Sequence, residues 1–153
     1  MRLATLGLGL TTALALGLAG PASAQERFAV VDPYFLAGNP DCDDLPNGFV
    51  GSIDVAPEDA ENIPVTSDDG TLTGTLDVDF SEEGEPLTLE EFNFEGELVA
   101  GAVIVKGGPG GNVYDYRPGG IASDTNLIAP DNPGGQQAAI SHVTFCFLPA
   151  DGS

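Results

Sequence analysis

The chain has 153 residues, which is enough for one domain with a hydrophobic core and too few for two. It carries 24 Asp and Glu residues against four Lys and Arg, so its formal net charge is −20. Such a surface repels nucleic acids and anionic lipids, and we exclude both as partners. The same acidity suits a protein that works in strong salt, or one that binds cations.

The first 24 residues have the pattern of a secretory signal peptide. Arg2 supplies the positive charge, residues 3–18 form an uncharged apolar run, and Ala22-Ser23-Ala24 matches the small-residue cleavage site. The apolar run is short for a transmembrane helix, and a retained N-terminal anchor is the alternative. We expect cleavage after Ala24 and a single secreted domain, residues 25–153, in the extracellular space or the periplasm.

Two cysteines, Cys42 and Cys146, lie near opposite ends of the secreted part. In an oxidising compartment an even pair predicts a disulfide. The alternatives are a metal site, which would need more Cys or His close by, and a catalytic thiol, which would leave the other cysteine unpaired. We expect a disulfide that closes a loop of about 100 residues and stabilises the small domain.

Short apolar segments and turn residues follow one another along the secreted part. Residues 28–31 predict the start of a strand that Pro33 confines to a sheet edge or a loop entry. Residues 49–55 predict a second strand. Residues 39–44 have turn chemistry, and residues 57–62 form a polar stretch.

The clearest alternation lies in residues 71–80, directly after an Asp69-Gly70 pair that favours a tight hairpin turn. Thr and Asp occupy the polar row of this segment. The apolar row consists of Leu72, Leu76, Val78 and Phe80. Period-two alternation with one polar face predicts a half-buried antiparallel strand.

The alternation changes phase between Leu89 and Phe92, because Glu90-Glu91 inserts one extra residue. A β-bulge explains such a shift. A short helix over residues 86–92 is the alternative.

The last third of the chain predicts three more strands. Residues 98–105 are apolar on both faces, as in a central strand, and the Gly-rich residues 106–111 form a turn. Residues 112–116 predict a short strand, residues 117–137 an ordered surface loop, and residues 138–147 the last strand. Six to eight short strands predict an all-β fold, an antiparallel β-sandwich with long Gly-, Pro- and Asp-rich loops.

The sequence offers no recognisable catalytic motif. Residues 106–111 lack the residue order of a phosphate-binding loop. Ser141 and His142 are neighbours on a predicted strand, so we expect their side chains on opposite faces and no nucleophile–base pair between them. We expect His142 to pack beside the disulfide as a hydrogen-bonded neighbour.

Two groups of loop residues are candidates for a Ca²⁺ site, because they supply hard oxygen ligands. One group is Asn39, Asp41, Asp43 and Asp44, and the other is Asp124, Asn126 and Asp131. Neither group has the ligand spacing of an EF-hand, and solvated acidic loops are the alternative. No other cofactor is expected.

Tyr114 and Tyr116 share one face of the predicted strand at residues 112–116. They are candidates for a weak ligand-stacking surface. The alternative is that they seal a face of the sheet.

Six short motifs occur in a fixed order along the chain. They are Asn39-Pro40-x-Cys42, Phe92-Asn93-Phe94, Ala102-Val103-Ile104-Val105-Lys106-Gly107-Gly108, Asn112-Val113-Tyr114, Ala129-Pro130-x-Asn132 and Ser141-His142-Val143-Thr144-Phe145-Cys146. With them the chain resembles, over residues 39–147, a widespread and functionally uncharacterised secreted bacterial β-domain. That family occurs in exported and surface-anchored proteins.

The resemblance implies a β-rich fold clasped by Cys42 and Cys146. The chain departs from the family in carrying Phe94 where Trp is frequent, and in its very acidic residues 47–97. Only six residues follow Phe147, with no anchoring signal among them, so we expect a released protein.

These observations favour a non-enzymatic secreted or cell-surface β-domain that acts as an extracellular interaction module for an unidentified ligand. The alternative is a small secreted hydrolase that acts on polysaccharide through paired carboxylates. A third hypothesis is a binding domain stabilised by Ca²⁺.

Overall fold

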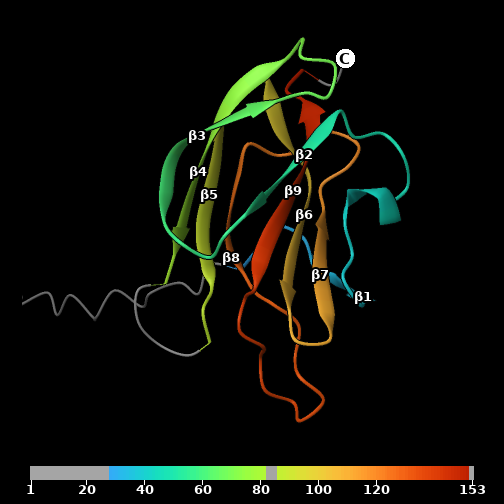
Figure 1. Cartoon of the computed structure of the whole chain (residues 1–153), viewed down its shortest axis with the longest axis vertical. Coiled ribbons are helices and arrows are strands. Elements are labelled where there is room, and N and C mark those ends of the chain that lie inside the picture. Colours follow the sequence, from blue (N-terminus) through green and yellow to red (C-terminus); the bar gives the residue numbers. More distant parts are fainter. Residues whose placement is uncertain (1–27, 82–85, 152–153) are drawn as a thin grey trace, which may run out of the picture.

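The computed structural model describes residues 28–81 and 86–151. In this part, nine strands form two antiparallel sheets packed face to face, which confirms the predicted all-β sandwich (Figure 1). The expected signal peptide, residues 1–24, lies outside the described residues, and so does most of the turn at residues 81–86. Among the described residues, no helix is long and apolar enough to cross a membrane.

The two sheets differ in size. Sheet A consists, in spatial order, of β1 (Tyr34–Ala37), β7 (Gly110–Asp115), β6 (Leu98–Gly107), β9 (His142–Pro149) and β2 (Gly51–Val55). Sheet B consists of β3 (Ala60–Thr66), β4 (Thr73–Phe80), β5 (Leu89–Gly96) and β8 (Ser123–Leu127). A single 3-10 turn, η1 (Cys42–Asp44), precedes β2 in the chain.

Aromatic side chains fill the space between the sheets. The predicted apolar row of β4 points inward, and Leu76, Val78 and Phe80 are buried. Phe92 of β5 contacts Phe145 of β9 edge to face, with ring centroids 5.3 Å apart. Such packing adds about 1 kcal/mol per pair to the burial of the rings themselves.

β6 is buried along its whole length, as its two-sided apolar sequence predicts. One face of the strand joins the core between the sheets. The other face belongs to a second apolar cluster on the outside of sheet A, formed by Leu45, Ala102, Ile104, Val113 and Cys146, with Leu36, Cys42 and Phe49 packed against it. Residues 42–49, which we call the covering segment, therefore keep water away from the middle of sheet A.

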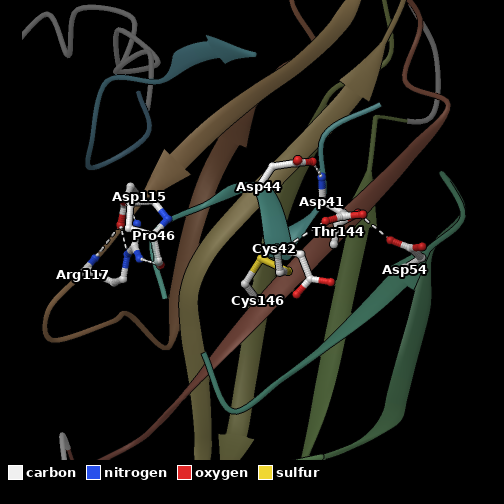
Figure 2. The surroundings of a disulfide bond; sticks show 10 residues. Asp41, Cys42, Asp44, Pro46, Asp54, Asp115, Arg117, Thr144 and Cys146 are labelled. Atoms are coloured by element: carbon white, nitrogen blue, oxygen red, sulfur yellow. Dashed lines mark hydrogen bonds and ion pairs between the residues drawn. A yellow bond between two sulfur atoms is a disulfide. The ribbon is translucent and has the colours of Figure 1, made fainter. Parts of the chain in front are cut away.

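The disulfide joins the covering segment to the sheet and confirms the predicted pairing. Cys42 in η1 is bonded to Cys146 in β9, with 5.8 Å between the Cα atoms and a sequence separation of 104 (Figure 2). Figure 2 also shows the capping of η1, in which Asp41 accepts a bond from the backbone N–H of Asp43 and Asp44 accepts one from that of Asp41. The start of the covering segment is thus fixed covalently and by its caps.

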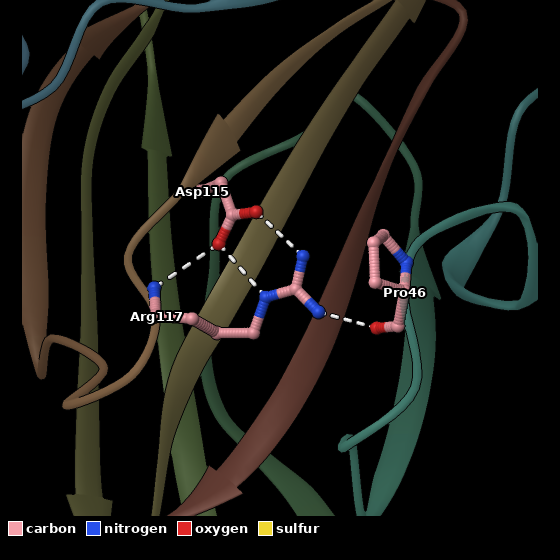
Figure 3. Close-up of polar contacts among 3 residues, drawn as sticks. All are labelled: Pro46, Asp115 and Arg117. Carbon is pink, nitrogen blue, oxygen red and sulfur yellow. Dashed lines mark hydrogen bonds and ion pairs between the residues drawn. The ribbon is translucent and has the colours of Figure 1, made fainter.

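Arg117 holds the other end of the covering segment (Figure 3). Its guanidinium donates two bonds to Asp115, at 2.9 and 2.5 Å, and a third bond to the carbonyl oxygen of Pro46. The same group lies 4.7 Å from the ring centroid of Phe49. These bonds hold the pKa of the Asp115 carboxyl below its usual value. One side chain therefore ties the end of β7 to the covering segment.

The local sequence patterns predicted several other elements correctly. The bulge in β5 is confirmed, because Asp79 pairs with Glu91 whereas Phe80 pairs with Leu89, leaving Glu90 as the extra residue. No helix forms over the described part of residues 86–92. The Gly-rich segment after β6 is the turn of the β6–β7 hairpin, as expected, with a positive φ at Gly108.

Four expectations about strands were wrong. The first strand is Tyr34–Ala37 and follows Pro33, whereas residues 28–31 are not a strand. The polar stretch at residues 57–62 contains the start of β3. The loop at residues 117–137 contains β8, and β9 begins at His142 rather than at residue 138. β3 and β8 form because β4 and β5 supply hydrogen bonds that local apolar alternation does not reveal, whereas residues 28–31 and 138–141 are mostly apolar but lie outside the strands.

A first prediction concerns the turn between β3 and β4. The Oδ1 atom of Asp69 accepts bonds from the Ser67 hydroxyl and from the Thr71 amide and hydroxyl, which together lower the pKa of Asp69 to about 2. A carboxyl whose pKa is lower in the folded protein than in the unfolded chain stabilises the fold at pH values above the unfolded-state pKa of about 4. This stabilisation is lost as the pH falls through the folded-state pKa of about 2. Asp69→Ala should therefore lower the melting temperature at pH 7 but leave it unchanged near pH 2.

Asp68→Ala is the matched control, since it removes a neighbouring exposed carboxylate from the same turn. Thermal melts of the three proteins between about pH 2 and pH 7 provide the measurement. An Asp69→Ala deficit that persists at pH 2 would contradict the prediction.

Candidate functional site

The exposed large apolar side chains lie in and next to the two edge strands β1 and β8. In the described part of the chain they are Phe28, Val30, Tyr34, Phe35 and Ile128. Phe28 and Val30 are the most accessible, at 77% and 70% exposed. We call these five residues the apolar edge, because β1 and β8 are edge strands of the two sheets: Tyr34 and Phe35 lie in β1, Phe28 and Val30 precede it, and Ile128 directly follows β8.

Specific hydrogen bonds hold the apolar edge in place. The Val30 amide donates to both carboxylate oxygens of Asp124, at 3.1 and 3.0 Å, which links residues 28–33 to β8. The Ile128 amide donates to the Tyr114 hydroxyl at 3.0 Å, and the side-chain amide of Asn112 donates to the Ile128 carbonyl at 3.0 Å. The backbone that carries Val30 and Ile128 is therefore fixed by hydrogen bonds, although their side chains are exposed.

A cavity of about 350 Å³ opens within the apolar edge. It is lined by Phe35, Asn112, Ile128, Ala129, Pro130 and Asp131. Its walls combine apolar side chains with one carboxylate and one amide, and polar and apolar groups contribute to the lining about equally. Local sequence patterns do not reveal this surface, because they predict the start of an edge strand at residues 28–31 and a loop at residues 117–137.

Tyr114 and Tyr116 do not form the expected ligand-stacking surface. Their side chains are 1% and 8% exposed and belong to the core between the sheets. The Tyr116 hydroxyl donates to Asp124 at 2.7 Å, and burial together with this bond raises the pKa of the Tyr116 phenol. Both tyrosines therefore seal the sheet face, which was the alternative interpretation of their spacing.

The outer face of sheet B carries a separate, acidic hollow of about 200 Å³. Its lining is Glu61, Asp77, Asp79, Glu91, Phe92 and Asn93. Asp79 and Glu91 are direct cross-strand neighbours, a pairing of like charges that destabilises a sheet. The two carboxylates are exposed and are the closest counterpart in this fold of the paired acids that a hydrolase needs.

A second prediction follows from this charge. As NaCl rises from about 0.05 to about 1 M, the melting temperature should increase, because screening shortens the range of repulsion to about 3 Å. Asp79→Asn should raise the melting temperature mainly at low salt, since it removes one partner of the like-charged pair. Differential scanning calorimetry across the series tests both statements. A flat series would contradict the salt-adaptation hypothesis.

The structure divides the first candidate Ca²⁺ group. Asp41 and Asp44 cap η1, and Asp44 also lines a surface cavity together with Asn39, whereas Asp43 lines a different cavity, next to Cys42. In the second group, Asp124 is buried and bonded to Tyr116, while Asp131 lines the cavity of the apolar edge. Among the described residues, no three His, Cys, Asp or Glu side chains form a metal-binding group.

The calcium hypothesis stays a prediction, and its test is a titration. If the first group binds Ca²⁺, calorimetry on chelator-treated protein should give a saturable one-to-one isotherm, selective over Mg²⁺ and abolished by Asp43→Ala. Glu58→Ala, which removes an exposed carboxylate elsewhere, is the control. Weak, salt-sensitive heat that is equal for both ions would show only a diffuse ion atmosphere.

Ser141 and His142 do contact each other, contrary to expectation. The Ser141 hydroxyl lies 3.1 Å from the Nδ1 atom of His142 and donates to the Lys106 carbonyl at 3.2 Å. The expectation was wrong because β9 begins at His142, so Ser141 does not follow strand alternation. Among the described residues, His142 has Ser141 as its hydrogen-bonded neighbour and no carboxylate partner that would complete a triad.

The chain was compared with protein-family models, with curated proteins and with solved structures, and none of the three comparisons finds a match.

Proposed function

We propose that this chain is a secreted, non-enzymatic β-domain that acts as an extracellular interaction module through its apolar edge. The observation that carries the proposal is that all five exposed large apolar side chains of the described part lie in, before or directly after the edge strands β1 and β8. Exposed apolar surface is unfavourable in water, and where it accumulates on a soluble protein it marks interaction sites.

Secretion is part of the same proposal. The disulfide supports it, because disulfides persist in oxidising compartments, and the signal-peptide pattern of residues 1–24 supports it independently. The resemblance of residues 39–147 to a secreted bacterial β-domain points the same way. Partners of this module are extracellular or surface components without strong negative charge, which leaves out nucleic acids and anionic membranes.

A binding array tests the proposal. Purified protein is applied to immobilised glycans and purified extracellular proteins, beside the variant Phe28→Ser/Val30→Ser and the control Thr75→Ser. The wild type and the control should bind the same component, and the double variant should lose at least about 90% of the signal, as expected for central apolar contacts. Equal binding by all three proteins, or by none, would contradict the proposal.

The alternative function, a polysaccharide hydrolase, is favoured by one observation, the facing pair Asp79 and Glu91 in the acidic hollow. Release of reducing ends from a panel of polysaccharides tests it. Activity that is lost in Asp79→Asn and in Glu91→Gln, and kept in Glu58→Gln, would replace the interaction module by this alternative.

A further inference from the structure

The outer side of β1 is an open sheet edge. Within the described residues, β7 is the one strand that pairs with β1, and it covers the inner side. The Gly38 amide donates to the Pro109 carbonyl, which continues the β1–β7 register. Because hydrogen-bonded pairs alternate along an antiparallel ladder, Tyr34 and Leu36 bond to β7, and the N–H and C=O groups of Phe35 and Ala37 point away from it.

These outward groups lie beside the cavity of the apolar edge. Phe35, which is 50% exposed, both carries two of the outward backbone groups and forms one wall of the cavity. A strand added along β1 would bond to the Phe35 and Ala37 backbone, and every second side chain of that strand would face the sandwich on this side. An open edge next to a partly apolar cavity therefore offers both the backbone bonds and the side-chain pocket of strand addition.

The negative charge around β1 indicates which kind of segment would bind there. Exposed carboxylates flank the edge, with Asp32 two residues before β1 and Asp131 in the cavity wall. Among the described residues, the ion pair is the one between Arg117 and Asp115, and neither Asp32 nor Asp131 takes part in it. A second copy of this chain would bring its own large negative charge to the same place, whereas Lys or Arg side chains would be attracted.

We propose that the free edge of β1 binds an extended segment of another protein by strand addition, a segment in which apolar residues alternate with Lys or Arg. This inference rests on the proposed function and names the partner chemistry of the same surface. The apolar side chains enter the cavity beside Phe35, and the backbone pairs with Phe35 and Ala37. The cationic side chains point to the opposite face of the added strand, and the negative charge of Asp32 and Asp131 attracts them at longer range.

Three synthetic octapeptides serve as probes. The first alternates Lys with Val and Phe, the second has Glu in place of every Lys, and the third is the first with N-methyl groups on the amides of one strand edge. Fluorescence anisotropy at low salt should show binding of the first peptide, at least about tenfold weaker binding of the N-methylated peptide, and no binding of the Glu peptide. Raising the salt should weaken the binding.

Variants of the protein locate the binding. Phe35→Ser should weaken binding of the Lys peptide by about tenfold or more, and Asp131→Asn by several-fold. Glu58→Gln, which removes the same charge from an exposed site in the loop before β3, should bind as the wild type does. The Phe35 and Asp131 side chains both reach solvent at the cavity, so we expect both variants to fold, and circular dichroism is the check.

Three results would overturn the inference. They are equal affinity for the Lys and Glu peptides, unchanged affinity for the N-methylated peptide, and a wild type that sediments as a dimer and becomes monomeric in Phe35→Ser, which would assign the edge to a second copy. If the wild type binds none of the peptides but still captures an array component through Phe28 and Val30, strand addition fails and the proposed function stands.

Discussion

Replacing Cys42 and Cys146 together by Ala is expected to lower the free energy of unfolding by about 4 to 5 kcal/mol. The disulfide spans 104 residues of sequence, so its loss frees the unfolded chain from a long closed loop. For a domain of this size the loss corresponds to roughly 15 °C in melting temperature. Alanine is the right replacement, because Cys146 is fully buried and a serine hydroxyl there would need a partner.

Urea denaturation with and without reductant measures this effect. Reductant should lower the urea midpoint of the wild type to that of the double variant. It should leave the midpoint of the double variant unchanged, so the variant serves as the control for other effects of the reductant. The Arg117 contacts should hold the covering segment less firmly once the disulfide is gone, since η1 loses its covalent tie to β9. Two alkylatable thiols in folded wild type, or coincident midpoints, would contradict the prediction.

Asp124→Ala is expected to destabilise the protein by about 3 kcal/mol. Asp124 is 4% exposed and accepts bonds from the Val30 amide, the Tyr116 hydroxyl and the Thr125 amide. Alanine would leave the buried Tyr116 hydroxyl without its acceptor. The same variant should release residues 28–33 from β8 and so weaken any binding at the apolar edge.

Milder variants separate these effects. Tyr116→Phe should cost about 1 kcal/mol, because the Asp124 carboxylate keeps its backbone donors. Asp131→Ala, the loss of a surface carboxylate, should stay within about 0.5 kcal/mol of the wild type. Urea denaturation ranks the three variants, and an Asp124→Ala protein as stable as Asp131→Ala would refute the role of this network.

Alkaline pH probes the same bond. Since burial and the bond to Asp124 raise the pKa of Tyr116 in the folded protein, the unfolded chain ionises this phenol first, above about pH 10. The contribution of Tyr116 to stability is therefore fully present below about pH 10 and decreases above it. The free energy of unfolding of Tyr116→Phe should decrease less steeply with pH in this range.

The sequence predicted those parts of the fold that local patterns determine. Alternation in residues 71–80 predicted β4, two-sided apolarity predicted β6, and a change of phase predicted the bulge at Glu90. The disulfide followed from compartment and cysteine number. Each of these inferences needs only near neighbours in the chain or a count of residues.

The remaining features depend on contacts between distant residues. β8 has the sequence Ser-Asp-Thr-Asn-Leu, and its pairing with β5 and the burial of Asp124 depend on partners that no local pattern names. The apolar edge was missed for the same reason, because apolar residues at 28–31 look alike whether or not a strand covers them. The structure shows that Phe28 and Val30 are exposed, whereas Ala29 and Val31 pack against the core.

The place of β9 has a consequence for biogenesis. This last strand inserts between β6 and β2, so sheet A cannot be completed until the C-terminal residues have been synthesised and delivered. Pairing over such sequence separations is slow compared with local hairpin formation. If the chain is secreted as proposed and enters a translocation channel N-terminus first, sheet A and the Cys42–Cys146 bond are completed only after the C-terminal residues have passed through the channel.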